Sequence, residues 1–232
     1  MSTTGALSHV RVLDLSRILA GPWATQSLAD LGADVIKVER PGSGDDTRGW
    51  GPPYLENDPS RSAYFCSVNR NKRSLALDLS DPKGAEILRR IARESHVVVE
   101  NFKQGALSRY GLGYESLSAE NPSLVYCSIT GFGQDGPEAS RPGYDFMIQG
   151  MAGLMSVTGE PSGMPMKVGV ALSDVLTGLN AAVAILAALN HAERTGQGQF
   201  IDMSLFDVTV ASLANQAANY LFTGAPPARL GN

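Results

Sequence analysis

The feature that most constrains the fold is the alternation of short apolar runs with helix-like segments. Residues 10–15 are mostly apolar, and they are followed by Trp23, Leu28 and Leu31 at roughly helical spacing. Residues 34–39 then return to the period-two pattern of a strand. Strand, helix and strand in this order predict a βαβ unit at the start of the chain.

The same alternation continues further along the chain. Residues 97–99 and 124–129 are short, rich in Val and Ile, and lack clean polar alternation, which is typical of parallel strands covered on both faces. The sequence therefore predicts an α/β fold, a Rossmann-like and mostly parallel sheet flanked by helices. We expect further strands at 74–79 and 200–204, a helix that starts at 80–82, and helices at about 175–194 and 206–223.

A long segment rich in Gly, Pro, Asp and Asn, residues 40–71, interrupts this pattern. We expect little regular structure there, and a loop of this length in a compact domain is usually functional. Arg, Lys and amide side chains in this region are suited to bind phosphate oxygens. The same residues are equally compatible with a basic turn exposed to solvent. The cations between the second and third predicted strands are Arg40, Arg48, Arg61, Arg70, Lys72 and Arg73.

Composition excludes several classes of protein. With 43% apolar and 18% charged residues, the chain has a globular composition, and its net charge of −4 offers no cationic field for nucleic acid. We expect no membrane association, because the longest apolar run, residues 181–189, is shorter than the ~20 residues of a bilayer span. The two cysteines and the absence of a secretory pattern favour a cytoplasmic protein, or one of the mitochondrial matrix if the source is eukaryotic.

Two kinds of cofactor site are not expected. Glu39 ends the second predicted strand, where an acidic residue would bind a ribose, yet residues 19–23 contain one glycine and then a proline in place of a G-x-G-x-x-G fingerprint. We therefore expect no nicotinamide or flavin. The three histidines, His9, His96 and His191, are scattered, so we expect no metal site.

Asp174 lies at the start of the long apolar helix predicted at 175–194. An aspartate at this place is an ordinary helix cap. The positive end of the helix also favours the carboxylate, so we expect its pKa below the usual ~3.9, which would leave an anion available as a nucleophile. Position alone favours the cap.

Several ordered segments resemble those of the class III CoA-transferases. The resemblance extends from residue 10 to residue 232, and it is closest to the dicarboxylate branch, which transfers CoA between succinate and glutarate, hydroxymethylglutarate or malate. The matching segments are RVLDL at 11–15, LAGP at 19–22, GADVIKVE at 32–39, GDDTR at 44–48, NKRS at 71–74, VENF at 99–102, SITGFG at 128–133 and TGQGQ at 195–199.

This resemblance implies roles for individual residues. Asp174 would be the catalytic nucleophile. Leu19 and Tyr144 would contact substrate; Leu19 replaces the Gln of formyl-CoA transferases, and Tyr144 replaces the acid/base His of the racemase branch. The residues implied in coenzyme A binding are Ile18, Arg40, Lys72, Arg73, Asn101, Phe102 and Arg109.

The implied reaction transfers CoA from an acyl-CoA such as succinyl-CoA to a carboxylic acid, through an aspartyl anhydride and an aspartyl-CoA thioester. Coenzyme A enters as a substrate, and no permanently bound cofactor is needed. Two alternatives stay open: an isomerase of the α-methylacyl-CoA racemase type, and a non-catalytic CoA-binding fragment.

The resemblance also predicts the domain organisation. Residues 1–225 would form the N-terminal portion of a CoA-binding large domain, and residues 226–232 would begin a linker to a small domain that the chain lacks. We therefore expect a truncated chain. Family members form interlocked homodimers, so the resemblance implies one here.

Overall fold

The computed structural model describes residues 5–231, and a six-stranded parallel sheet forms its centre. The strand order is β3-β2-β1-β4-β5-β6, and each neighbouring pair is parallel. The strands are β1 (Arg11–Asp14), β2 (Asp34–Glu39), β3 (Lys72–Ala76), β4 (Val97–Glu100), β5 (Val125–Thr130) and β6 (Phe200–Ser204). This confirms the predicted α/β fold.

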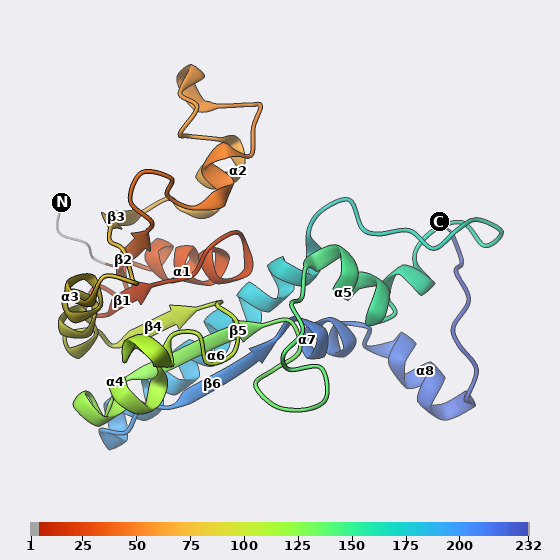
Figure 1. Cartoon of the computed structure of the whole chain (residues 1–232). Helices are drawn as coiled ribbons and strands as arrows, with labels where there is room; N and C mark the ends of the chain where they lie inside the picture. Colours follow the sequence, from red (N-terminus) through yellow and green to blue (C-terminus); the bar gives the residue numbers. More distant parts are fainter. Residues whose placement is uncertain (1–4, 232) are drawn as a thin grey trace.

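Helices cover both faces of the sheet (Figure 1). The α-helices are α1 (Ala20–Asp30), α2 (Ala63–Val68), α3 (Pro82–Arg93), α4 (Tyr114–Glu120), α5 (Asp145–Met151), α6 (Leu172–Thr195), α7 (Leu205–Ser212) and α8 (Asn215–Thr223). Short 3₁₀ helices are η1 (Asp46–Gly49), η2 (Leu55–Asn57), η3 (Ser108–Tyr110) and η4 (Leu154–Val157). Helices α1 and α6 pack on one face, whereas α3 and α4 pack on the other.

The strands are apolar without alternation because both of their faces are buried. In β4, Val97 and Val99 belong to the core beneath α1 and α6, and Val98 between them belongs to the core beneath α3 and α4. Strand order reverses between β1 and β4: β2 and β3 follow β1 on one side, and β5 and β6 follow β4 on the other. Open parallel sheets bind ligands at such a point, at the carboxyl ends of the strands.

A close contact between α1 and α6 sets how these two helices pack against each other. A Cβ atom on Gly178 would lie 2.6 Å from the Ala20 carbonyl oxygen and 2.9 Å from the Trp23 Cβ, so only glycine permits this approach. The contact packs the second turn of α6 against the first turn of α1. Asp174, about one turn before Gly178 in α6, therefore lies near Ala20 at the start of α1.

By length and composition, α6 could cross a membrane, with a mean hydropathy of 1.8 over an 18-residue window. Its buried side, which includes Ala181 and Ile185, belongs to the core that it shares with α1 and the sheet. A core helix of a globular domain passes the same test, so the hydropathy of α6 is explained by its packing.

Three predicted elements differ from the structure. The predicted helix at 206–223 is two helices, because Ala214 adopts a φ of 47° that no α-helix accommodates. Residues 40–71 contain α2, whose first turn is capped by the Ser62 hydroxyl that accepts a hydrogen bond from the Phe65 N–H. Strand β3 ends at Ala76, so residues 77–79 form a loop at the carboxyl edge of the sheet.

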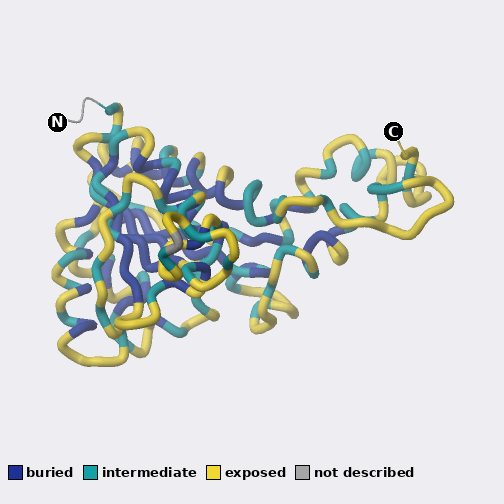
Figure 2. Tube along the Cα trace, turned by 90° about the horizontal axis from the view of Figure 1, so that it is seen from above, coloured by how far each residue is buried: buried dark blue, intermediate teal, exposed yellow. Residues whose placement is uncertain are grey.

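The buried residues gather in the sheet and its covering helices, while the part that contains α8 and the end of the chain is largely exposed (Figure 2). Arg229 donates hydrogen bonds to the carbonyl oxygens of Glu160 and Gly163, so the segment predicted as a linker lies along that loop. The division at residue 225 stays a prediction. Residues 1–4 and 232, which the predicted ranges include, lie outside the described residues.

Candidate functional site

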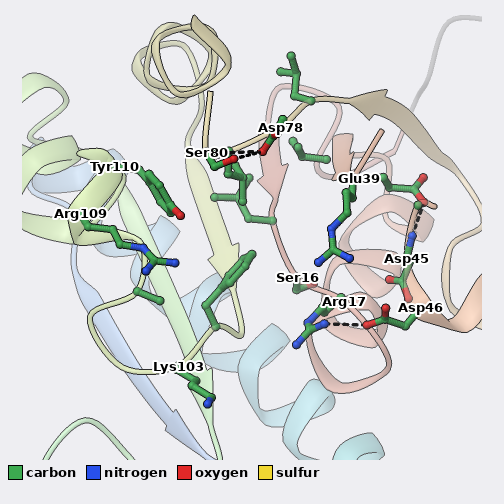
Figure 3. A pocket seen from close by; sticks show the side chains of 18 residues that line it. Ser16, Arg17, Glu39, Asp45, Asp46, Asp78, Ser80, Lys103, Arg109 and Tyr110 are labelled. Atoms are coloured by element: carbon green, nitrogen blue, oxygen red, sulfur yellow. Dashed lines mark hydrogen bonds and ion pairs between the residues drawn. The ribbon is translucent and has the colours of Figure 1, made fainter. Parts of the chain in front are cut away.

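A pocket of about 460 Å³ opens at the carboxyl ends of β1 to β4 (Figure 3). Arg109 and Tyr110 line one side, Arg17 and Asp46 lie across from them, and Asp78 is in the loop after β3. The loops that follow the strands therefore build this pocket, as the fold predicts. Its other lining residues are Leu15, Ser16, Val38, Glu39, Arg40, Gly44, Asp45, Leu77, Leu79, Ser80, Phe102, Lys103 and Ala106.

The pocket combines an apolar lining with cationic side chains. Leu77, Leu79 and Phe102 offer surface to a flat apolar group. Arg40 and Arg109 are exposed at the pocket and form no ion pair with another residue of the described chain. The neighbouring acids Glu39 and Asp45 are already paired, with Arg48 and Lys37 respectively. The pocket thus suits a ligand with an aromatic portion and anionic groups, such as a nucleotide.

A second cavity of about 150 Å³ adjoins the first, since both are lined by Arg17, Phe102 and Lys103. Asp174 lines this second cavity together with Tyr144. The structure brings together there the predicted residues Ile18, Leu19, Asn101, Phe102, Tyr144 and Asp174.

Asp174 is the third residue of α6, three positions after the N-cap residue Ala171, and so lies within the first turn rather than at the cap. The Ala20 backbone N–H, at the start of α1, donates a hydrogen bond to its carboxylate. Asp145 supplies the acceptor at the start of α6, because its Oδ1 accepts a hydrogen bond from the Ser173 N–H at 2.8 Å. The cap role weighed for Asp174 in the sequence is therefore filled by Asp145, which leaves the Asp174 carboxylate facing α1.

The expected low pKa of Asp174 is wrong. Burial, and then the nearby Asp145 carboxylate, raise the pKa of Asp174 to about 7, although the hydrogen bond from Ala20 opposes this rise. The helix-end effect, typically 0.3–1 kcal/mol, is smaller than the desolvation of a buried carboxylate. Asp174 is therefore anionic above about pH 7 and a stronger base than an exposed aspartate.

The loop between β1 and α1 forms one wall of both cavities. Asn101 binds it from the end of β4: its Oδ1 accepts a hydrogen bond from the Arg17 N–H at 2.9 Å, and its Nδ2 donates to the Arg17 carbonyl at 2.7 Å. Arg17 in turn forms an ion pair with Asp46 at 2.7 Å. Asn101 thus shapes the site through the backbone of this loop.

Two of the residues implied in coenzyme A binding, Lys72 and Arg73, line neither cavity. The Lys72 side chain is 2% exposed, and its Nζ donates to the Asp14 carboxylate at 3.0 Å. Arg73 forms a bidentate ion pair with Asp34. Asp34 is the first residue of β2, so this pair lies at the amino-terminal ends of the strands, away from the pocket. Both cations are therefore already paired and do not point toward a ligand at the carboxyl ends of the strands.

Other residues of the site carry little signal in the sequence. Residues 77–80 line the large pocket because β3 ends at Ala76, three residues before the predicted end of this strand. Tyr64 of α2 lines neither cavity, but burial, and then the carboxylates of Asp174 and Asp145, raise its pKa to about 12. Its ring packs edge-on against Trp50, with 5.1 Å between ring centroids.

Comparisons with known proteins show what this chain is similar to. A family model described as CoA-transferase family III matches residues 7–232. A succinate–glutarate CoA-transferase of Agrobacterium fabrum is 58% identical over 229 residues, which are 97% of this chain and 57% of the relative. A human succinyl-CoA:glutarate CoA-transferase is 51% identical over 95% of this chain and 50% of its own length.

A solved structure from Brucella suis, described as a CAIB/BAIF family protein, superposes with a TM-score of 0.95 at 56% identity. The match covers 98% of this chain and 60% of that structure's chain. The chain therefore spans only about half to three fifths of the length of these relatives.

Proposed function

Because this chain belongs to CoA-transferase family III, we propose that the intact protein transfers coenzyme A from an acyl-CoA to a free carboxylic acid. One observation carries this proposal: a single carboxylate, Asp174, faces a backbone N–H donor in a small cavity that opens beside a nucleotide-sized pocket. The relatives, described as CoA-transferases for succinate and glutarate, support the same reaction.

In this proposal, coenzyme A spans the two cavities. The adenine would lie on the apolar lining of the large pocket, and its phosphates would pair with Arg40 and Arg109. The pantetheine arm would pass Phe102, which lines both cavities, and bring the thioester to Asp174. Lys72 and Arg73 have no part in this placement.

The reaction proceeds by covalent catalysis. The Asp174 carboxylate attacks the acyl-CoA carbonyl, and the C–S bond breaks to give a mixed anhydride and the CoA thiolate. The thiolate then attacks the aspartyl carbonyl, which releases the donor acid and leaves an aspartyl-CoA thioester. The acceptor carboxylate attacks this thioester, a second anhydride forms, and the thiolate takes the acceptor acyl group and frees Asp174.

The chain's own groups assist these steps. The Ala20 N–H donates to a carboxylate oxygen of Asp174 in the resting state. In the thioester intermediate this oxygen becomes a carbonyl oxygen, which gains negative charge when the next nucleophile adds, so a fixed donor stabilises that transition state. The raised pKa of Asp174 also favours attack, because a more basic carboxylate is the better nucleophile.

We further propose a dicarboxylate such as glutarate as acceptor. The small cavity has cations on its rim, Arg17, Lys103 and Arg141, and one of these would pair with the carboxylate that does not react. Arg141 already holds Glu138 at 2.9 Å and lies beside Tyr144, so it is placed to exchange that partner for the substrate.

A homodimer forms part of the same proposal. Its support is the resemblance, together with exposed apolar side chains on α8, where Leu221 is 78% and Phe222 is 89% exposed.

The test of the proposed function is a transfer assay on the intact protein. Succinyl-CoA is offered with a panel of mono- and dicarboxylates, and the CoA products are separated by mass. Asp174→Asn should abolish transfer while the protein stays folded. Asp81→Asn is the matched control, since Asp81 caps α3 at an exposed site and Asn caps equally well. Undiminished transfer by Asp174→Asn would disprove the proposal.

A further inference from the structure

Two buried ion pairs lie beneath the loop that joins β1 to α1. Lys72 Nζ is 3.0 Å from the Asp14 carboxylate, and Lys37 Nζ is 2.9 Å from that of Asp45. The four side chains are at most 2% exposed, and their charges balance. None of the four reaches Asp174, so the reaction proposed above does not use them directly.

The first pair fixes both ends of the loop. Asp14 Oδ1 accepts a hydrogen bond from the Ser16 N–H at 2.9 Å. Lys72 Nζ donates to the Pro22 carbonyl, in the first turn of α1, at 2.9 Å, and to Asn69 Oδ1 at 2.9 Å. The three protons of the Lys72 ammonium group are thus matched by three acceptors, one of which belongs to α1 itself.

The second pair holds the middle of the loop. Lys37 Nζ donates to the Ser16 carbonyl at 2.8 Å, and Asp45 Oδ2 accepts from the Ile18 N–H at 3.2 Å. Ile18 has a φ of 71°, in the left-handed region that β-branched residues avoid. Such a strained conformation persists only where its surroundings impose it. Asp45 and Lys37 supply contacts that do so.

Two residues after Ile18, the loop ends at Ala20, whose N–H donates to Asp174. The direction of this N–H depends on the loop that the ion pairs hold. A donor displaced by ~1 Å loses much of its effect on a transition state, since such errors of position can cost about 100-fold in rate.

Stability alone gives a weak reason for these charges. Buried ion pairs are often no more stabilising than apolar side chains of the same size, whereas the removal of one partner leaves an unpaired buried charge. We propose that Lys37, Asp45, Asp14 and Lys72 are positioning residues that hold the β1–α1 loop so that Ala20 faces Asp174. This inference rests on the proposed function, and it gives Lys72 a role other than coenzyme A binding.

Lys37→Met in the intact protein tests this inference. We expect kcat for transfer to fall roughly 10- to 100-fold, with little change in KM for the acyl-CoA, because Arg40 and Arg109 still bind it. The double variant Lys37→Met/Asp45→Asn removes the unpaired carboxylate and should regain thermal stability. Its kcat should stay low, because nothing replaces the hydrogen bond to the Ser16 carbonyl.

Leu117→Ala is the matched control. Leu117 is buried in the core between α4 and the sheet, on the face away from α1, so its truncation lowers Tm without touching the loop. We expect this variant to keep its kcat at temperatures where it is folded. The double variant, with balanced charge, keeps the test informative if Lys37→Met alone does not fold.

The outcomes separate the two claims. If the wild type transfers CoA and kcat simply follows Tm across all variants, or recovers in the double variant, the positioning role is refuted and the proposed function stands. If the wild type shows no transfer with any acid, the proposed function fails and the positioning role fails with it. Low kcat in both Lys37 variants, beside unchanged kcat in Leu117→Ala, supports the inference.

Discussion

Replacement of Asp174 by Asn should stabilise the protein at neutral and alkaline pH while it abolishes transfer. Burial and the Asp145 carboxylate raise the pKa of Asp174 from the ordinary 3.8 to about 7. Between these values the unfolded chain has lost the proton and the folded protein still binds it, so the free energy of unfolding falls as pH rises. Asn carries no charge at any pH and escapes this loss.

The magnitude follows from the two pKa values. A rise from 3.8 to about 7 corresponds to at most ~4 kcal/mol, at ~1.36 kcal/mol per pKa unit. Partial exposure to solvent reduces this, so we expect Asp174→Asn to be about 2–3 kcal/mol more stable than the wild type at pH 8. The difference should shrink toward zero near pH 4.

Urea denaturation of both proteins at several pH values between 4 and 8 measures this difference. Asp14→Asn is a control of opposite sign. Burial raises the pKa of Asp14, but Lys72 and Lys37 outweigh it and hold the pKa at about 2, so this carboxylate stabilises the fold above pH 4 and ceases to do so as pH falls toward 2. A pH-independent difference for Asp174→Asn, or a less stable variant at pH 8, would refute the reasoning.

Three further predictions concern activity and binding. Since the nucleophile is the carboxylate and its pKa is about 7, kcat/KM should rise about tenfold per pH unit below pH 7 and level off above it, as a pH–rate profile would show. Arg40→Met and Arg109→Met should each weaken coenzyme A binding by ~1–3 kcal/mol in calorimetry, whereas Arg73→Met should leave it unchanged. Arg141→Met should raise KM for glutarate more than for a monocarboxylate of similar length, and equal effects in a kinetic comparison would exclude a contact with the second carboxylate.

The sheet could be predicted because its determinants are local. Runs such as 97–99 are short, apolar at each position and made of β-branched Val, a pattern that favours a strand with two buried faces. The break between α7 and α8 could not, since neither Gly nor Pro interrupts residues 206–223 and an alanine such as Ala214 does not mark a positive φ. Likewise, the early end of β3 at Ala76 depends on its pairing with β2, which lies about forty residues earlier.

The sequence predicts which residues gather at the candidate site better than it predicts what each residue does there. The sequence shows that Lys72 is a cation near a loop, but its burial against Asp14, 58 residues away, exists only in the fold. The pKa of Asp174 depends in the same way on burial in the folded chain and on Asp145, 29 residues earlier. A local rule such as the effect of the helix end gives the wrong direction where desolvation is larger.

Covalent trapping of Asp174 tests the central claim most directly. The intact protein is incubated with succinyl-CoA and then with hydroxylamine, which attacks an aspartyl anhydride or thioester to give a hydroxamate. Peptide mass analysis should find this hydroxamate on Asp174 in the wild type and none in Asp174→Asn. A hydroxamate on another carboxylate of the site, such as Asp145, or none in an enzyme that still transfers CoA, would contradict the account.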